Sequence, residues 1–376
     1  MNGKTRILVL VCLLATALLA GVPPAASAGE RVTVRYARNF QVRYRSDGIL
    51  VTVKNPWRGA GTGFRYLLRP RGSTAPADCD DCQVIETPVR RMVALSSTYL
   101  AFIDRLGLVG NLVAVNDVTR VQTPSIRRAA ARGRIVSVGQ GSSLQVETIL
   151  NLAPDVIFTY ATGGFRDAHP KLLEAGLHVA VCAEYMESHP LGRAEWIKFI
   201  ALFFDRGARA ETLFNALEKR YLAMAALTRG VTHRPTVLTN IPYGGQWRVA
   251  GGKSFIARFL ADAGGDYIWK DVPGQGSRPT DIELVYDRGR DADFWLNTGT
   301  WNSLARARQA DPRLADFRSL RTGNVFNNNR RLGTGGGNDY WESGMMEPDV
   351  ILADLIRILH PDLLPDHRLY YYRKLQ

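Results

Sequence analysis

One stretch of the sequence occurs twice, and this repeat constrains the fold more than any other feature of the chain. Residues 145–163 read QVETILNLAPDVIFTYATG, and residues 281–299 read DIELVYDRGRDADFWLNTG. With Glu147 placed over Glu283, an offset of 136 aligns the copies without a gap, and Asp155 falls on Asp291. Each copy is typical of a short amphipathic helix, a turn and a buried strand that ends at a Thr-Gly loop.

The repeat predicts two similar α/β lobes whose loops face each other. A strand end that opens into a glycine loop is where α/β sheets bind ligands. Glu147 and Glu283 could act as a paired acid and base. Their places on matching helices in separate lobes instead favour two equivalent surface contacts. A carboxylate at the start of a helix also suits the helix dipole.

The first 28 residues have the pattern of an export signal. Lys4 and Arg6 form its charged end, an apolar run covers residues 7–20, and Ala-Ser-Ala precedes a mature start at Gly29. The run is shorter than the roughly 20 residues that a membrane-spanning helix requires. Cys12 lies inside the run and not at the cut, so no lipid attachment is predicted. We therefore expect a soluble periplasmic protein without a lipid anchor.

The patterning of the remaining chain predicts several units, since its length is too great for one core. Alternation with a period of two predicts a small β extension, which includes residues 32–36 and a hairpin turn at Asp47-Gly48. Strand–helix alternation starts near Arg90, and a long amphipathic run could cross between the lobes. The expected units are a β-rich extension at 29–88 with a linker at 70–88, an N-terminal α/β lobe at 89–204, an interlobe helix at 205–230 and a C-terminal α/β lobe at 231–376.

Two cysteines, Cys79 and Cys82, stand in a C-D-D-C loop. In an oxidising compartment this spacing favours a local disulfide. A metal site would need a second ligand pair, and a thioredoxin-like site would need a strand before the motif and a helix on it.

Catalytic, metal-binding and nucleic-acid motifs are not evident in the sequence. Gly251-Gly252-Lys253-Ser254 lacks the first glycine of a phosphate loop and is more typical of a turn and helix cap. The six histidines show no pair at ligand spacing. The net charge of +13 is spread without a Lys/Arg block, which argues against nucleic acid and is compatible with an anionic small ligand. We expect a binding protein, not an enzyme, with no cofactor and no direct metal site.

Five segments carry a resemblance to a known family: RMVALSSTYLAFIDRLGL, VETILNLAPDVIF, HPLGRAEW, WRVAGGKSF and GNDYWESGMMEPDVILADLIRILHP. In this order the chain from about Arg90 to its C-terminus resembles the periplasmic binding proteins of ABC importers for ferric siderophores, haem and cobalamin. The resemblance implies two α/β lobes joined by one rigid helix, a ligand in the cleft and little hinge closure. It also implies that one acidic residue per lobe docks on permease arginines; those positions match Glu147 and Glu283. A monomer is expected.

Loop composition indicates which residues could line the cleft, where aromatic rings give contact area and polar groups fix orientation. Each aromatic residue could equally pack in the core. The candidates are Ser97, Thr98, Tyr99, Tyr160, Tyr185, Tyr243, Trp247, Arg248, Trp301, Tyr340 and Trp341. Among them Trp247 is favoured most, and Arg248 could meet a siderophore carboxylate or catecholate.

The resemblance does not choose the cargo. A ferric siderophore is the first expectation, with cobalamin and haem as alternatives. A haem receptor often offers an axial Tyr or His, so the tyrosines keep that alternative open. A secreted carbohydrate- or peptide-binding adhesin that uses the β extension is the alternative from another class.

Overall fold

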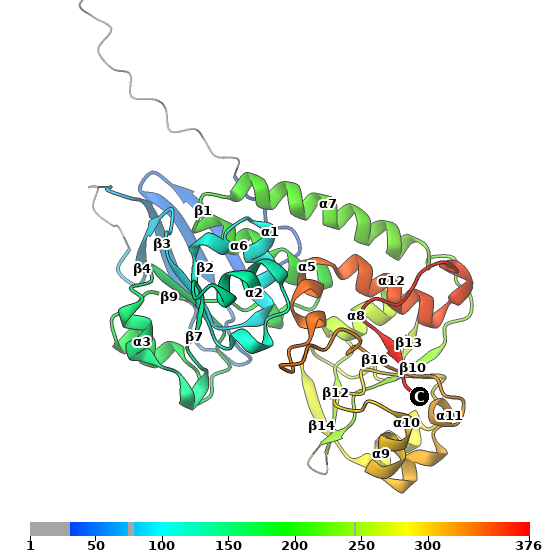
Figure 1. Ribbon diagram of the computed structural model, residues 1–376. Coiled ribbons are helices and arrows are strands. Elements are labelled where there is room, and N and C mark those ends of the chain that lie inside the picture. Colours follow the sequence, from blue (N-terminus) through cyan, green and yellow to red (C-terminus); the bar gives the residue numbers. More distant parts are fainter. Residues whose placement is uncertain (1–30, 74–78, 244–245) are drawn as a thin grey trace, which may run out of the picture.

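The computed structural model describes residues 31–73, 79–243 and 246–376 (Figure 1). The predicted export signal lies outside this part of the chain. No helix within these ranges combines the length and the apolar character needed to cross a membrane.

The N-terminal lobe is built on a parallel five-stranded sheet with the order β7-β6-β5-β8-β9. Its strands are β5 (Met92–Ala94), β6 (Leu112–Val115), β7 (Val136–Ser137), β8 (Val156–Thr159) and β9 (Val179–Val181). Its helices are α1 (Leu100–Arg105), α2 (Pro124–Ala131), α3 (Val146–Asn151) and α4 (His169–Glu174). Strands β5, β8 and β9 are buried throughout, as expected for apolar strands that are covered on both faces.

The C-terminal lobe repeats this arrangement. Its sheet has the order β13-β10-β15-β16-β17, in which only β17 is antiparallel to its neighbour. The strands are β10 (Thr236–Thr239), β13 (Asp266–Tyr267), β15 (Phe294–Leu296), β16 (Val325–Asn327) and β17 (Arg373–Lys374). The helices are α8 (Phe255–Asp262), α9 (Ile282–Gly289), α10 (Leu304–Ala310), α11 (Arg318–Arg321) and α12 (Pro348–Leu359). The order β6-β5-β8-β9 corresponds to β13-β10-β15-β16, so the prediction of two similar α/β lobes is confirmed.

A small antiparallel sheet is added to the C-terminal lobe. It has the order β11-β12-β14 and consists of β11 (Pro242–Tyr243), β12 (Gln246–Ala250) and β14 (Ser277–Thr280).

Helices join the two lobes. After α5 (Pro190–Ala194) and α6 (Trp196–Leu202), α7 (Gly207–Ala226) forms 20 residues of continuous helix inside the predicted stretch 205–230. At 1.5 Å per residue it is about 30 Å long. It contacts α6 at the N-terminal lobe and α12 at the C-terminal lobe, and Figure 1 shows it lying across both.

The predicted β extension is a four-stranded sheet that belongs to the core of the N-terminal lobe. It consists of β1 (Phe40–Arg45), β2 (Gly48–Val53), β3 (Phe64–Pro70) and β4 (Gln83–Thr87), in that order. Phe40 packs on Trp196 of α6 at 4.8 Å between ring centroids. The side-chain amide of Gln83 exchanges two hydrogen bonds with the backbone of Val179 and so covers the edge of β9. The described part of the expected linker at 70–88 therefore contains a strand.

Residues 32–36, predicted as a strand, take a different course. They lie against α6 and α7, where the buried carboxylate of Glu195 accepts the backbone N–H groups of Arg35, Tyr36 and Ala37 at 2.6–3.1 Å. Lys198 also pairs with Glu195, at 3.1 Å. A side-chain carboxylate thus replaces the neighbouring strand as hydrogen-bond acceptor, which sequence alternation could not reveal.

The repeat has a different register from the ungapped alignment in its second half. Glu147 and Glu283 are each the second residue of their helix, which agrees with the offset of 136. The strands β8 and β15 start at residues 156 and 294, because α9 is longer than α3 by two residues. Asp155 therefore corresponds to Asp293 and not to Asp291.

The two corresponding aspartates accept equivalent hydrogen bonds from the backbone of a neighbouring strand. Asp155 accepts the backbone N–H groups of Arg90 and Arg91 just before β5, and Asp293 accepts that of Thr236 at the start of β10. A shift of two residues preserves the alternation of faces along a strand, which is why the ungapped match looked correct.

Candidate functional site

A cleft of about 820 Å³ lies between the lobes. Residues from the extension, from the loop before α5 and from the C-terminal lobe line it, among them Arg58, Tyr185, Phe255, Asn328 and Trp341. This volume is within the range of about 300–1,000 Å³ that is typical of small-molecule sites.

A half-buried arginine, Arg193 of α5, forms part of the cleft wall. Its guanidinium donates to the carbonyl oxygen of Tyr185 at 2.9 Å and stacks 3.6 Å from the ring centroid of Phe255. Among the described residues, no carboxylate lies within salt-bridge distance of it. Burial lowers the pKa of Arg193 to about 10, so the side chain stays charged at neutral pH. The cleft therefore contains a half-buried positive charge that an anionic ligand could pair with.

A buried acidic group, Glu184, lies close enough to Arg193 to act on its charge. Glu184 accepts a hydrogen bond from the hydroxyl of Thr98 at 2.9 Å, and burial raises the pKa of its carboxyl above the usual value. Thr98, which was predicted to contact ligand, thus positions Glu184 instead.

Asparagines at strand ends line the C-terminal side of the cleft. Asn240 follows β10 and Asn297 follows β15, both in the left-handed region with φ of 66° and 58°. Asparagine tolerates that conformation better than most residues. Asn297 accepts a hydrogen bond from the hydroxyl of Tyr372 at 2.7 Å, which fixes its side chain. These residues were not predicted from the sequence, although an asparagine directly after an apolar strand is a signal that could have identified them.

Some predicted site residues do line the cleft. Tyr185 donates its hydroxyl to the carbonyl oxygen of Ala161 at 2.7 Å, Tyr340 is buried in the cleft wall, and Trp341 is 40% exposed. Ser97 and Tyr160 line a second cavity of about 330 Å³, to which Trp341 also contributes.

Three other candidates pack in the core and line neither cavity, so the structure does not bring them to the cleft. Trp247 is fully buried, donates its indole N–H to the carbonyl oxygen of Thr239 at 3.0 Å and stacks on Trp295. Tyr99 and Trp301 are also buried and line neither cavity.

Two further candidates lie on the strands beside the cleft. Along β12, Arg248 is exposed, on the face opposite to Trp247, and does not line the cleft. The backbone of Tyr243 belongs to β11, but its side chain lies outside the described structure.

The two glutamates of the repeat are both exposed, in the first turns of α3 and α9. Their surroundings differ, because Glu283 pairs with Arg313 at 3.1 Å whereas no ion pair is found for Glu147 within the described chain.

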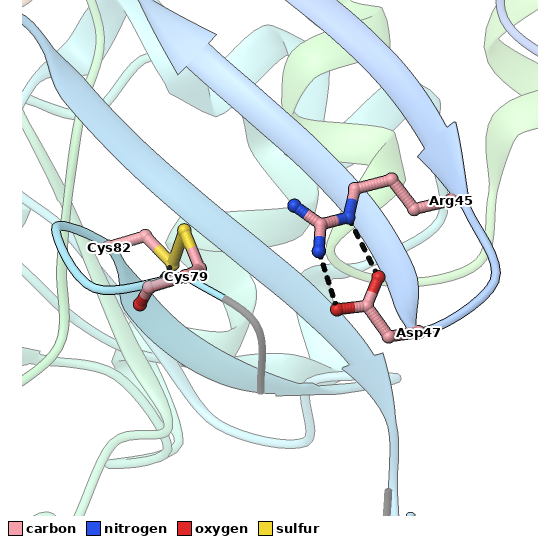
Figure 2. Close-up of a disulfide and its surroundings, with 4 residues drawn as sticks. All are labelled: Arg45, Asp47, Cys79 and Cys82. Atoms are coloured by element: carbon pink, nitrogen blue, oxygen red, sulfur yellow. Dashed lines mark hydrogen bonds and ion pairs between the residues drawn. A yellow bond between two sulfur atoms is a disulfide. The ribbon is translucent and has the colours of Figure 1, made fainter. Parts of the chain in front are cut away.

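The two cysteines of the C-D-D-C loop are joined by a disulfide between Cys79 and Cys82 (Figure 2). Nearby, Arg45 and Asp47 form a two-pronged ion pair at 2.8 and 2.9 Å across the β1–β2 turn. In the described residues, no three His, Cys, Asp or Glu side chains gather in a group that could hold a metal ion.

The comparison with known families agrees with this geometry. Residues 92–330 match the periplasmic binding protein family, and the chain belongs to that family. Solved structures of similar fold include an ABC transporter substrate-binding protein of Listeria monocytogenes, which is 18% identical, with a TM-score of 0.55 over 73% of this chain and 99% of that one. A possible iron-binding protein of Staphylococcus epidermidis is 16% identical, with a TM-score of 0.57 over 72% of this chain and 99% of that one. A periplasmic haem-binding protein of Pseudomonas aeruginosa is 22% identical, with a TM-score of 0.55 over 73% and 94%.

Two relatives from Methanocaldococcus jannaschii extend the match beyond the family region. Both are called uncharacterised lipoproteins; one is 27% identical over 91% of this chain and 85% of its own length, the other 25% over 90% and 86%. Because each match leaves only about a tenth of the chain uncovered, each includes part of the β extension at 29–88. They also correct one expectation: these relatives are lipoproteins, so the prediction of a protein without a lipid anchor is wrong. That prediction rested on the position of Cys12 in the leader alone.

Proposed function

We propose that this protein is the receptor of an ABC importer for a ferric chelate, which it binds in the cleft between its lobes and delivers to the permease. The observation that carries the proposal is the half-buried guanidinium of Arg193, which lines a cleft of suitable volume and forms no ion pair among the described residues. Glu184 and Glu187 act on it electrostatically without pairing with it, so an anionic siderophore complex could supply a direct ion pair. Trp341 and Tyr185 offer rings at the same cleft for a chelate to contact.

Haem and cobalamin are the alternatives within the same family. Haem iron bound by tyrosine requires a phenolate, and burial raises the pKa of Tyr185 and of Tyr340 to about 12, which makes the phenolate harder to form at either residue than at an exposed tyrosine. The haem-binding relative named above supports keeping haem in the test, and its propionates would suit Arg193. Cobalamin would make less use of the positive charge of Arg193.

Delivery to the permease is proposed to use Glu147 and Glu283. Each is exposed on the first turn of the corresponding helix in its lobe, so two equivalent acidic contacts are available. Charge-assisted pairs with permease arginines would fix the orientation of the receptor. A lipid anchor like that of the lipoprotein relatives would keep the receptor close to the membrane.

The first test is to identify what the protein carries. Protein isolated from its own cells should have the colour and mass of a metal chelate, and a titration with ferric siderophores, haemin and cyanocobalamin should quench tryptophan fluorescence. Quenching by none of them, together with binding to sugars or peptides, would replace the receptor by the adhesin alternative.

A further inference from the structure

The turn between β2 and β3 connects the extension to the cleft. The carbonyl oxygen of Pro56 lies 3.2 Å from the hydroxyl of Tyr185 and shares its hydrogen with the carbonyl oxygen of Ala161. Trp57 packs against Gly163, where an added Cβ would collide with the indole, and its ring lies 5.8 Å from that of His169. The turn is therefore seated on the ligand-side loop of the N-terminal lobe.

The next residue, Arg58, reaches the opposite lobe. Its guanidinium lies directly against Gly276, so close that a Cβ on Gly276 would overlap it. Both residues line the cleft. The side chain is exposed, and no hydrogen bond or ion pair to it is found among the described residues. Arg58 thus bridges the cleft while its donors stay available.

The charges around the cleft show what Arg58 could bind. Arg58, Arg193 and Arg278 all line the cavity, and Glu187 is the only acidic residue of the described lining. The carboxylate of Glu187 is occupied, because it accepts the backbone N–H groups of Arg38 and Asn39 and the indole N–H of Trp196. The charged groups of the cleft that remain available are therefore cationic, and they include Arg58 and Arg193.

We propose that the N-terminal extension supplies a ligand-binding residue, Arg58, which pairs with a carboxylate or catecholate at the rim of the bound chelate. Arg193 pairs with a second anionic group deeper in the cleft, so the preferred ligand carries at least two such groups. This inference rests on the proposed receptor function. It adds a contact from a part of the chain outside the family region of residues 92–330.

The test is a fluorescence titration with four probes: haemin and a ferric tris-catecholate, which are anionic, and a neutral ferric trihydroxamate and cyanocobalamin. For Arg58→Ala we expect about tenfold weaker binding of the preferred anionic probe, which corresponds to the loss of one charge-assisted hydrogen bond. Arg58→Lys should recover part of it, because it keeps the charge without the two-pronged geometry. Gly276→Ala should also weaken binding, since the methyl group displaces the guanidinium.

The matched control is Arg43→Ala, which removes the same charge from an exposed position on β1 that does not line the cleft. It should bind as the wild type does. Wild-type affinity in Arg58→Ala would overturn the role of Arg58, and a wild type that binds only neutral probes would overturn the anionic ligand while the receptor function stands. Binding of none of the four probes would overturn the receptor function and this inference together.

Discussion

The two copies of the helix–turn–strand repeat show which features the lobes share and which they do not. Both copies begin with an exposed glutamate on the first helical turn, and both tie the strand to its neighbour through an aspartate. They differ by two residues in helix length and in what surrounds the strand. Ile157 of β8 corresponds to Trp295 of β15, which belongs to a cluster of large aromatic rings. The scaffold is repeated, but each lobe fills its core with different side chains.

The edges of the two sheets differ as well. In the N-terminal lobe, Gln83 of the extension pairs with β9, whereas in the C-terminal lobe the short strand β17 covers β16. The extension is therefore one way to protect an edge strand that the other lobe protects with its own C-terminus. It has the additional consequence of bringing Arg58 to the cleft.

The largest expected effect tests the aromatic core of the C-terminal lobe. Trp247→Ala should lower the free energy of unfolding by about 3–5 kcal/mol, because it leaves a cavity beside Trp295. Trp341→Ala is the matched variant: it should leave the melting temperature nearly unchanged and weaken chelate binding by about 1–3 kcal/mol. Denaturation curves and titrations of both variants test this. If Trp247 contacted ligand, Trp247→Ala would weaken chelate binding and leave the free energy of unfolding nearly unchanged.

The next test concerns the register of the repeat. Asp155→Ala and Asp293→Ala should each cost about 1–3 kcal/mol, because each removes the charged acceptor of backbone N–H groups at the start of a strand. Burial alone would raise the pKa of both carboxyls, but these N–H donors lower it. The stability that each carboxylate contributes to the fold is therefore lost as the pH falls through its lowered pKa. Asp291→Ala, at an exposed residue, should be nearly neutral. Equal losses at Asp291 and Asp155 would restore the ungapped alignment.

The sequence predicted the repeated parts of this fold better than the unique ones. Strands such as VIFT and helices with apolar residues at regular spacing carry their own signal, so both lobes and α7 could be recognised. The course of residues 32–36 depends on Glu195, which is about 160 positions away, and no local pattern reports that contact.

The cleft was harder to predict for the same reason. A tryptophan beside glycines is compatible with both a core and a ligand site, and only packing places Trp247 in the former. Arg193 and the strand-end asparagines are identified as cleft residues by the way the two lobes lie opposite each other.

A smaller effect is expected at the junction between the lobes. His189 caps α5 by accepting the N–H of Leu191 at 3.0 Å, and burial lowers the pKa of its imidazole to about 4. The unfolded chain, with a pKa near 6.5, binds more protons between these values, so the free energy of unfolding should fall as the pH drops from about 6.5 to about 4. His189→Asn keeps a capping side chain that does not titrate and should cost about 1 kcal/mol or less at pH 7. Thermal melts across this pH range should show a shallower acid decline in the variant; parallel declines would contradict the assignment.

The smallest effect on stability is expected at the docking glutamates. Glu147→Ala and Glu283→Ala should each cost about 0.3–1 kcal/mol, because a carboxylate favours the first helical turn. Ligand affinity should be unchanged while uptake is impaired, most of all in the double variant. Arg313→Ala should leave uptake intact or raise it, since Glu283 loses its internal partner. Wild-type uptake by the double variant would exclude the docking role.

The central claim is that the cleft binds an anionic metal chelate through Arg193, and calorimetric titration of the wild type and Arg193→Ala tests it most directly. We expect one chelate per chain for the wild type and at least about tenfold weaker binding for the variant, equivalent to about 1.4 kcal/mol. Circular dichroism should show that the variant keeps its fold. Equal affinity in the two proteins, or no binding of any chelate by the wild type, would contradict the account.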